Sequence, residues 1–299
     1  MSYLIKYGLL GLAVVFFTSC EKEVSFDLPK DIAEKVVVEG SIELNQPPFV
    51  LLTKSFGFFS KLDLSSLQNS FLSGAEIFVS DGSRNVQLKE YSIDTLGNKF
   101  NFYTIDTSKP ADLSFIGQVG TAYHLKIVYN NKTYEASTTI PQPVSFDSLW
   151  SEPFPTPIPD HPEFRRVSAS YTDPVTPGNR YRYFISVNNG PFNASTFSTI
   201  NDDIINGTHV TMNFYNVTSP MDTSSNLEKF AFLPGDSVVI KLSAIDKESY
   251  NFWETLEFSV GTTGNPFSTP IKVPSNISNG ALGVWTGYGS SYNKVFIKD

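Results

Sequence analysis

Polar and apolar residues alternate along much of the chain, and this is the pattern of β-strands that are buried on one face only. In the clearest case Tyr123, Leu125 and Ile127 alternate with His124 and Lys126. Two asparagines at positions 130 and 131 then indicate a turn into a second strand at residues 133–136. The segment therefore predicts an antiparallel hairpin.

Similar strand signals recur in both halves of the chain. In the first half they cover residues 36–42, 49–53, 75–79 and 86–88, and Asp81-Gly82 is typical of a hairpin turn. In the second half they cover residues 167–171, 181–187 and 238–242. No helical periodicity interrupts residues 36–140, so this stretch predicts a β-sandwich of about 100 residues.

One segment of the second half departs from the strand pattern. Asp246 is a residue type that caps helix N-termini, and Tyr250, Trp253 and Leu256 follow it at a spacing of three. We therefore expect a short helix near residues 247–258. Gly280, Gly283, Gly287 and Gly289 come later, and they indicate tight turns near a terminal strand.

Prolines are concentrated in the middle of the chain. Seven of them lie between Pro141 and Pro162, where they favour extended backbone and cannot donate sheet hydrogen bonds. We interpret residues 141–163 as a linker. The chain is thus predicted to be all-β, with two immunoglobulin-like or fibronectin-like sandwiches at residues 36–140 and 164–299 and the short helix in the second.

The N-terminus has the three parts of a bacterial lipoprotein signal. Lys6 gives the positive region, residues 8–17 are apolar, and Thr18-Ser19 precede Cys20. The apolar run is too short to cross a bilayer. We expect residues 1–19 to be removed as a signal peptide and Cys20 to be acylated, with palmitate among its acyl chains, and to anchor the protein in the lipid bilayer. The charged residues 20–35 would then form a tether.

Composition narrows the possible partners. The formal net charge is −8, and it becomes one unit more negative when Lys6 leaves with the signal. An acidic chain is a poor ligand for nucleic acid, so no nucleic acid is expected as a partner. Cys20 is the only cysteine, so no disulfide can form within the chain. Hydrophobic residues make up 40% of the sequence, which is enough for a substantial core.

Candidate catalytic and metal sites are few. His124, His161 and His209 are far apart in sequence and match no metal-ligand spacing, and Ser290 lacks the frame of a hydrolase elbow. The sequence therefore predicts no catalytic residues, no metal ligands and no cofactor. Asp202 and Asp203 offer oxygen atoms to calcium, but they lack the twelve-residue pattern of a calcium loop, and a turn is the favoured interpretation.

Three aromatic residues near the C-terminus are the candidate binding surface. Trp285, Tyr288 and Tyr292 would stack on a sugar or line a groove for a peptide. The alternative, which is the more common role of such residues, is packing in the core or at the edge of a β-sandwich.

Several segments together resemble one family, the Bacteroidota lipoproteins grouped as domain of unknown function 4249. The resemblance covers nearly the whole chain after Cys20, and it lies in the order and spacing of these segments: Phe26-Asp27-Leu28-Pro29, Lys35-Val36-Val37-Val38-Glu39-Gly40-Ser41-Ile42, Gly74-Ala75-Glu76-Ile77-Phe78-Val79-Ser80-Asp81, Asp173-Pro174, Tyr181-Arg182-Tyr183, Asp202-Asp203, Asn206-Gly207, Ile245-Asp246, Tyr250, Trp253 and Gly264-Asn265-Pro266-Phe267.

The resemblance implies a place in the outer membrane and a genetic association with TonB-dependent transporters, but no known reaction. Glu21-Lys22-Glu23 is similar to the signal that sends such lipoproteins to the outer face of that membrane. Our leading hypothesis is a surface lipoprotein that binds a ligand or a transporter and is not an enzyme. Two alternatives stay open: an adhesion or envelope-structural module, and a surface hydrolase with an unrecognised site.

Overall fold

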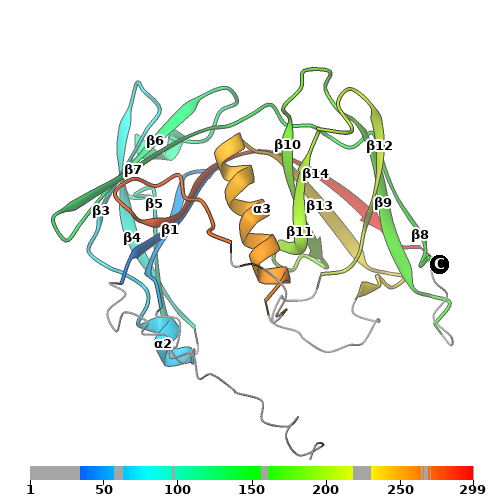
Figure 1. Ribbon diagram of the computed structural model, residues 1–299, viewed down its shortest axis with the longest axis horizontal. Helices are drawn as coiled ribbons and strands as arrows, with labels where there is room; N and C mark the ends of the chain where they lie inside the picture. The colour runs from blue at the N-terminus through cyan, green and yellow to red at the C-terminus, as the bar shows by residue number, and fades with distance from the viewer. Residues whose placement is uncertain are drawn as a thin grey trace, which may run out of the picture. The chain divides into compact units, whose positions relative to one another are not determined.

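The computed structural model describes residues 34–56, 63–95, 98–155, 161–217, 230–263, 265, 269 and 271–298. The predicted signal peptide, Cys20 and most of the predicted tether lie outside these residues. Within them the chain forms two β-sheets and two α-helices (Figure 1). The predicted all-β sandwich architecture with a helix in its second half is confirmed.

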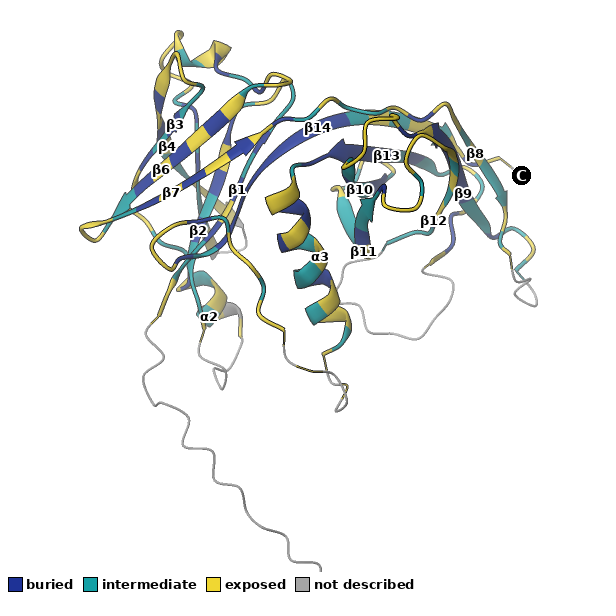
Figure 2. Ribbon diagram, turned by 45° about the horizontal axis from the view of Figure 1, so that its top comes forward, coloured by how far each residue is buried: buried dark blue, intermediate teal, exposed yellow. Residues whose placement is uncertain are grey.

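Strands of the first half form one sandwich. One layer holds β1 (Val36–Glu43), β2 (Phe49–Lys54), β5 (Asn98–Thr104) and β4 (Asn85–Thr95). The sheet continues from β4 into the facing layer of β3 (Glu76–Ser80), β6 (Ala122–Tyr129) and β7 (Lys132–Thr139). Figure 2 shows buried and exposed residues alternating along β6 and β7, as the sequence pattern predicts. Both predicted hairpins are confirmed, and Asn130 and Asn131 turn with positive φ angles of 49° and 60°.

The second half also has two layers. The large sheet continues through β14 (Leu282–Phe296), β13 (Ser237–Ala244), β10 (Arg180–Val187) and β11 (Asn193–Asn201). A three-stranded sheet of β12 (His209–Phe214), β9 (Arg165–Thr172) and β8 (Ser148–Pro153) forms the other layer. Val167, Tyr171, Ile185 and Ile240 are among the buried residues of the core of this half.

A single long strand joins the two halves. The first part of β14 pairs in parallel with β1, and its last part pairs with β13, so one eleven-stranded sheet includes strands of both predicted domains. Each half keeps its own cluster of buried residues, and residues 34–299 cluster as one compact unit. The division into two domains at residues 36–140 and 164–299 stays a prediction.

The glycines of β14 have a role that differs from the expected one. Gly280 does turn the chain, with a φ angle of +74°, but Gly283, Gly287 and Gly289 lie inside the strand. A Cβ atom on Gly289 would be 2.0 Å from the Pro141 carbonyl oxygen, and one on Gly283 would be 1.8 Å from that of Val38. These two positions therefore admit a neighbouring backbone, so the prediction of turns there is wrong.

The structure also differs from the predicted linker at residues 141–163, because β8 lies inside it. Ser148–Pro153 pairs with β9 in the antiparallel direction. Only the last residue of β8 is a proline, and β8 is the outer strand of its sheet, so its other edge needs no hydrogen bonds within that sheet. The many prolines around β8 conceal the strand signal of the five residues before Pro153.

Helix α3 (Lys247–Gly261) confirms the predicted helix and extends it by three residues. Asp246 caps it, since its Oδ1 accepts a hydrogen bond of 2.8 Å from the Ser249 backbone N–H. The buried residues of α3 include Tyr250, Phe252 and Glu257, whereas the predicted face was Tyr250, Trp253 and Leu256. The short helix α2 (Leu64–Gln68) was not predicted, because five residues are too few to show a helical period.

Candidate functional site

Two of the three predicted surface aromatics are buried. Trp285 has 0% of its side chain exposed and Tyr288 has 7%, whereas Tyr292 has 51%. Successive side chains of β14 point to opposite faces of the sheet. Trp285 therefore points into the core of the first half, whereas Tyr288 and Tyr292 lie on the opposite face. A buried indole has no free face for a ligand, so the predicted stacking platform of all three residues does not form.

Trp285 fills a space that the first half leaves for it. Gly40 of β1 lies beside it, and a Cβ atom there would be 2.7 Å from the indole ring. The indole Nε1–H donates a hydrogen bond of 3.1 Å to the Tyr123 carbonyl oxygen. The Asn276 side chain fixes the Trp285 backbone with hydrogen bonds to both its N–H and its C=O. The C-terminal strand thus completes the N-terminal core.

The opposite face of the large sheet carries a buried ion pair beneath α3. Arg182 of β10 donates from Nε to Glu257 of α3 at 3.3 Å, and both side chains are 8% exposed. Glu257 also accepts hydrogen bonds from the Ser198 backbone N–H at 2.8 Å and the Ser198 hydroxyl at 2.5 Å. The Arg182 guanidinium lies 3.5 Å from the centre of the Trp253 ring. These contacts hold α3 against the sheet.

A second ion pair lies next to the first on the same face. Lys241 of β13 donates to Glu43 of β1 at 3.1 Å, and its ammonium group lies 4.3 Å from the centre of the Phe184 ring. Burial lowers the pKa of Lys241, and the Glu43 carboxylate opposes that shift. The Tyr292 hydroxyl donates to the same carboxylate. Burial and this bond raise the pKa of Tyr292. The Glu43 carboxylate of this pair thus holds the Tyr292 side chain in place.

A group of five aromatic rings, three of them exposed, includes two that contact this pair. We call them the aromatic face, defined as Phe49, Tyr91, Phe102, Phe192 and Tyr292. Phe192 is 40% exposed and meets Tyr292 edge to face, with the ring centres 5.7 Å apart. Across β1, Phe49 stacks on Phe102 at 5.4 Å and Phe102 stacks on Tyr91 at 5.7 Å. The strand registers place all of the strand-borne rings on one face of the sheet.

The ion pair under α3 has a measurable role. Replacing Glu257 with glutamine should lower the free energy of unfolding by about 2 kcal/mol, because Arg182 then loses a charge-assisted partner inside the protein. Urea denaturation measures this loss. The matched control is Glu248→Gln on the first turn of the same helix, where the carboxylate is exposed and only helix-end electrostatics change, which is worth at most about 1 kcal/mol. Equal losses in both variants would contradict this role.

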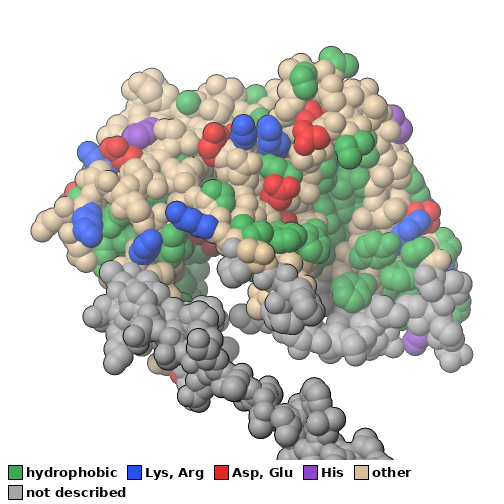
Figure 3. All heavy atoms as spheres, viewed as in Figure 1, with side chains coloured by type: hydrophobic (Ala, Val, Ile, Leu, Met, Phe, Trp, Pro, Cys, Tyr) green, Lys and Arg blue, Asp and Glu red, His purple; other side chains and the backbone are tan. Residues whose placement is uncertain are grey.

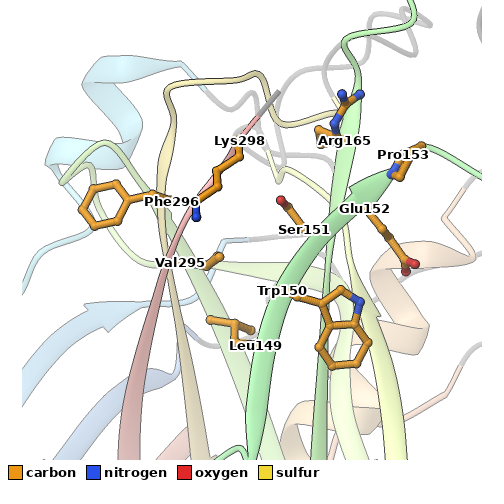
Figure 4. A pocket seen from close by; sticks show the side chains of 9 residues that line it. All are labelled: Leu149, Trp150, Ser151, Glu152, Pro153, Arg165, Val295, Phe296 and Lys298. Carbon is orange, nitrogen blue, oxygen red and sulfur yellow. The ribbon is translucent and has the colours of Figure 1, made fainter.

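A pocket of about 400 Å³ opens between β8 and the end of β14 (Figure 4). Apolar and cationic side chains line it together, among them Leu149, Ser151, Arg165, Val295, Phe296 and Lys298. No local sequence signal predicts this pocket. Its residues come from three separated strands or their ends, and none of them forms a motif on its own.

The remaining candidates have structural partners. Asp202 is buried, and its Oδ2 accepts from the backbone N–H groups of Gly178 and Asn179 at 2.7 and 2.8 Å. These bonds tie Asp202 to a neighbouring loop, and the backbone N–H groups of Ile205 and Asn206 donate to its carbonyl oxygen, which forms a turn. Among the residues that the structure describes, no group of three or more histidine, cysteine or acidic side chains is placed to hold a metal ion.

Figure 3 shows acidic and basic side chains close to one another around α3.

Comparisons with known proteins identify the family. No helix in the described part of the chain is long and apolar enough to cross a membrane. A search of curated proteins finds no match. One family model, described as Domain of unknown function (DUF4249), matches residues 21–293. The chain therefore belongs to the family of proteins that carry this domain.

Proposed function

We propose that this protein is a lipid-anchored outer-membrane lipoprotein, turned toward the cell surface, that binds a TonB-dependent transporter as an accessory protein and is not an enzyme. The observation that carries the proposal is the exposed pair Phe192 and Tyr292, which lies beside the buried Lys241 and its half-buried partner Glu43. The transporter as partner comes from the family resemblance.

The pair has the properties of a protein-binding surface. Aromatic side chains are enriched where proteins contact one another, and a few of them supply most of the binding energy. Tyr292 is held by its hydrogen bond to Glu43, so little side-chain freedom is lost when a partner covers it. Phe49 adds further exposed aromatic area on the same face. A ring that is exposed and fixed favours contact with another protein.

Pull-down from outer membranes with the lipidated protein tests the proposal. The wild type should retrieve a transporter, and a Phe192→Ala, Tyr292→Ala double variant should retrieve at least about tenfold less, as expected when two interface anchors are removed. Phe197→Ala is the matched control, because Phe197 is 62% exposed but lies against the last turn of α3. Retrieval of no transporter by the wild type would overturn the partnership, whereas equal retrieval by both variants would overturn only the surface.

Lipidation at Cys20 leads to a separate prediction. Cys20→Ala should leave the protein unprocessed or free of the membrane, because stable anchoring needs more than one acyl chain and the cysteine carries them. Fractionation of cells into soluble and membrane parts, followed by immunoblotting, measures this outcome. Wild-type amounts of the variant at its mature size in the membrane fraction would contradict lipidation at Cys20.

A further inference from the structure

We propose that the pocket between β8 and β14 binds a small anion with an apolar body, such as a short-chain carboxylate. The proposal does not depend on a transporter partner, since the pocket lies outside the aromatic face. Its volume of about 400 Å³ is within the range of small-molecule sites and admits a body of roughly eight carbon atoms.

The inner walls of the pocket are apolar. Leu149 of β8 and Val295 of β14 lie on the sides of their strands that face the pocket (Figure 4). Phe296 also borders the pocket at the end of β14, but Figure 4 shows its ring on the other side of the strand from Val295, and 60% of that side chain is exposed. A hydrocarbon chain or ring placed between the two strands would remove the Leu149 and Val295 side chains from water, which favours binding of an apolar ligand body.

The polar groups of the pocket favour negative charge. Lys298 follows β14, and its side chain runs back along the strand in Figure 4. Within the described residues it makes no ion pair. Arg165 of β9 lines the same pocket, donates from Nη1 to the carbonyl oxygens of Pro162 and Phe164, and interacts electrostatically with the nearby Glu163 carboxylate. Ser151 adds a hydroxyl group.

Among the described residues that line the pocket, one is acidic, and its carboxylate already has partners. Glu152 accepts a hydrogen bond of 2.9 Å from Arg166 and another from the Ser168 hydroxyl. Figure 4 shows its carboxylate on the other side of β8 from Ser151. Lys298 therefore gives the pocket a positive charge that is paired with no described carboxylate, although the whole chain has a net charge of −8. An anionic head group can pair with Lys298 while the apolar body lies against Leu149 and Val295.

Equilibrium dialysis of octanoate against the full-length protein in nanodiscs of neutral lipid tests the proposal, with empty nanodiscs subtracted. We expect saturable binding of one octanoate per chain. Octanol, which has the same body without the charge, should bind at least about tenfold more weakly, and acetate should not bind measurably. No saturable binding of octanoate, or equal binding of octanol, would overturn the proposal.

Variants separate the charge from the fold. Lys298→Gln should raise the Kd for octanoate at least about tenfold, and Lys298→Arg should keep it near the wild-type value. Lys272→Gln is the control, because Lys272 is exposed and lies outside the pocket. Unchanged Tm values show that the variants are folded. An unchanged Kd in Lys298→Gln, or an equal rise in Lys272→Gln, would overturn the role of the pocket.

Discussion

Replacing Trp285 with alanine is expected to lower the free energy of unfolding by about 3 to 5 kcal/mol, which is the usual cost of emptying a buried aromatic site. The side chain has no exposed area and packs in the core of the first half, although it comes from the last strand of the chain. The substitution also leaves the Tyr123 carbonyl oxygen without the indole donor. Urea denaturation followed by circular dichroism measures the change.

The same substitution elsewhere in the chain is the control. Trp150 of β8 is 37% exposed and joins neither of the two large buried clusters, so Trp150→Ala should cost much less than Trp285→Ala. A loss at Trp285 no larger than the loss at Trp150 would mean that β14 does not complete the first core.

The shared sheet leads to the second large expectation. A fragment of residues 34–145, expressed alone, should not form a stable fold and should show no cooperative unfolding transition. It lacks both the β14 residues that pair with β1 and the indole of Trp285. Small domains tolerate few losses of this size, since their total stability is about 5 to 15 kcal/mol. Thermal melting by circular dichroism and the dispersion of amide signals in NMR measure the folding of the fragment.

Cutting the folded chain gives the matching control. When the intact protein is cleaved at a protease site inserted after Pro155, the two pieces should stay together on size-exclusion chromatography, because β1 and β14 remain paired. A fragment of residues 34–145 that unfolds cooperatively by itself would show that the first half is an independent domain, as the sequence predicts.

Local sequence patterns predict the elements that are determined by residues close together in the sequence. The hairpin of β6 and β7 follows from alternation and from Asn130-Asn131, and α3 follows from its cap at Asp246. The pairing of β1 with β14 joins residues more than 200 positions apart and leaves no local signal. For the same reason the glycines of β14 resembled turns, whereas Gly283 and Gly289 admit neighbouring backbone.

The candidate site shows the same division. Composition drew attention to the aromatic residues near the C-terminus, but it could not assign them to the two faces of a strand whose first residue was unknown. Tyr292 contacts Glu43 and Phe192, and both are distant from it in the sequence. The buried pair of Arg182 and Glu257 was not predicted, because charged residues are usually exposed in folded proteins. The two residues are also far apart in the sequence, and no local pattern identifies them as partners.

Site-specific photo-crosslinking in the native outer membrane tests the central claim most directly. A benzophenone amino acid is placed at position 292 on the aromatic face, or at position 197 beside the end of α3 as the control. Contact through the aromatic face predicts a light-dependent crosslink to a TonB-dependent transporter from position 292 and none from position 197. Absence of that crosslink at position 292, or equal crosslinks from both positions, would contradict it.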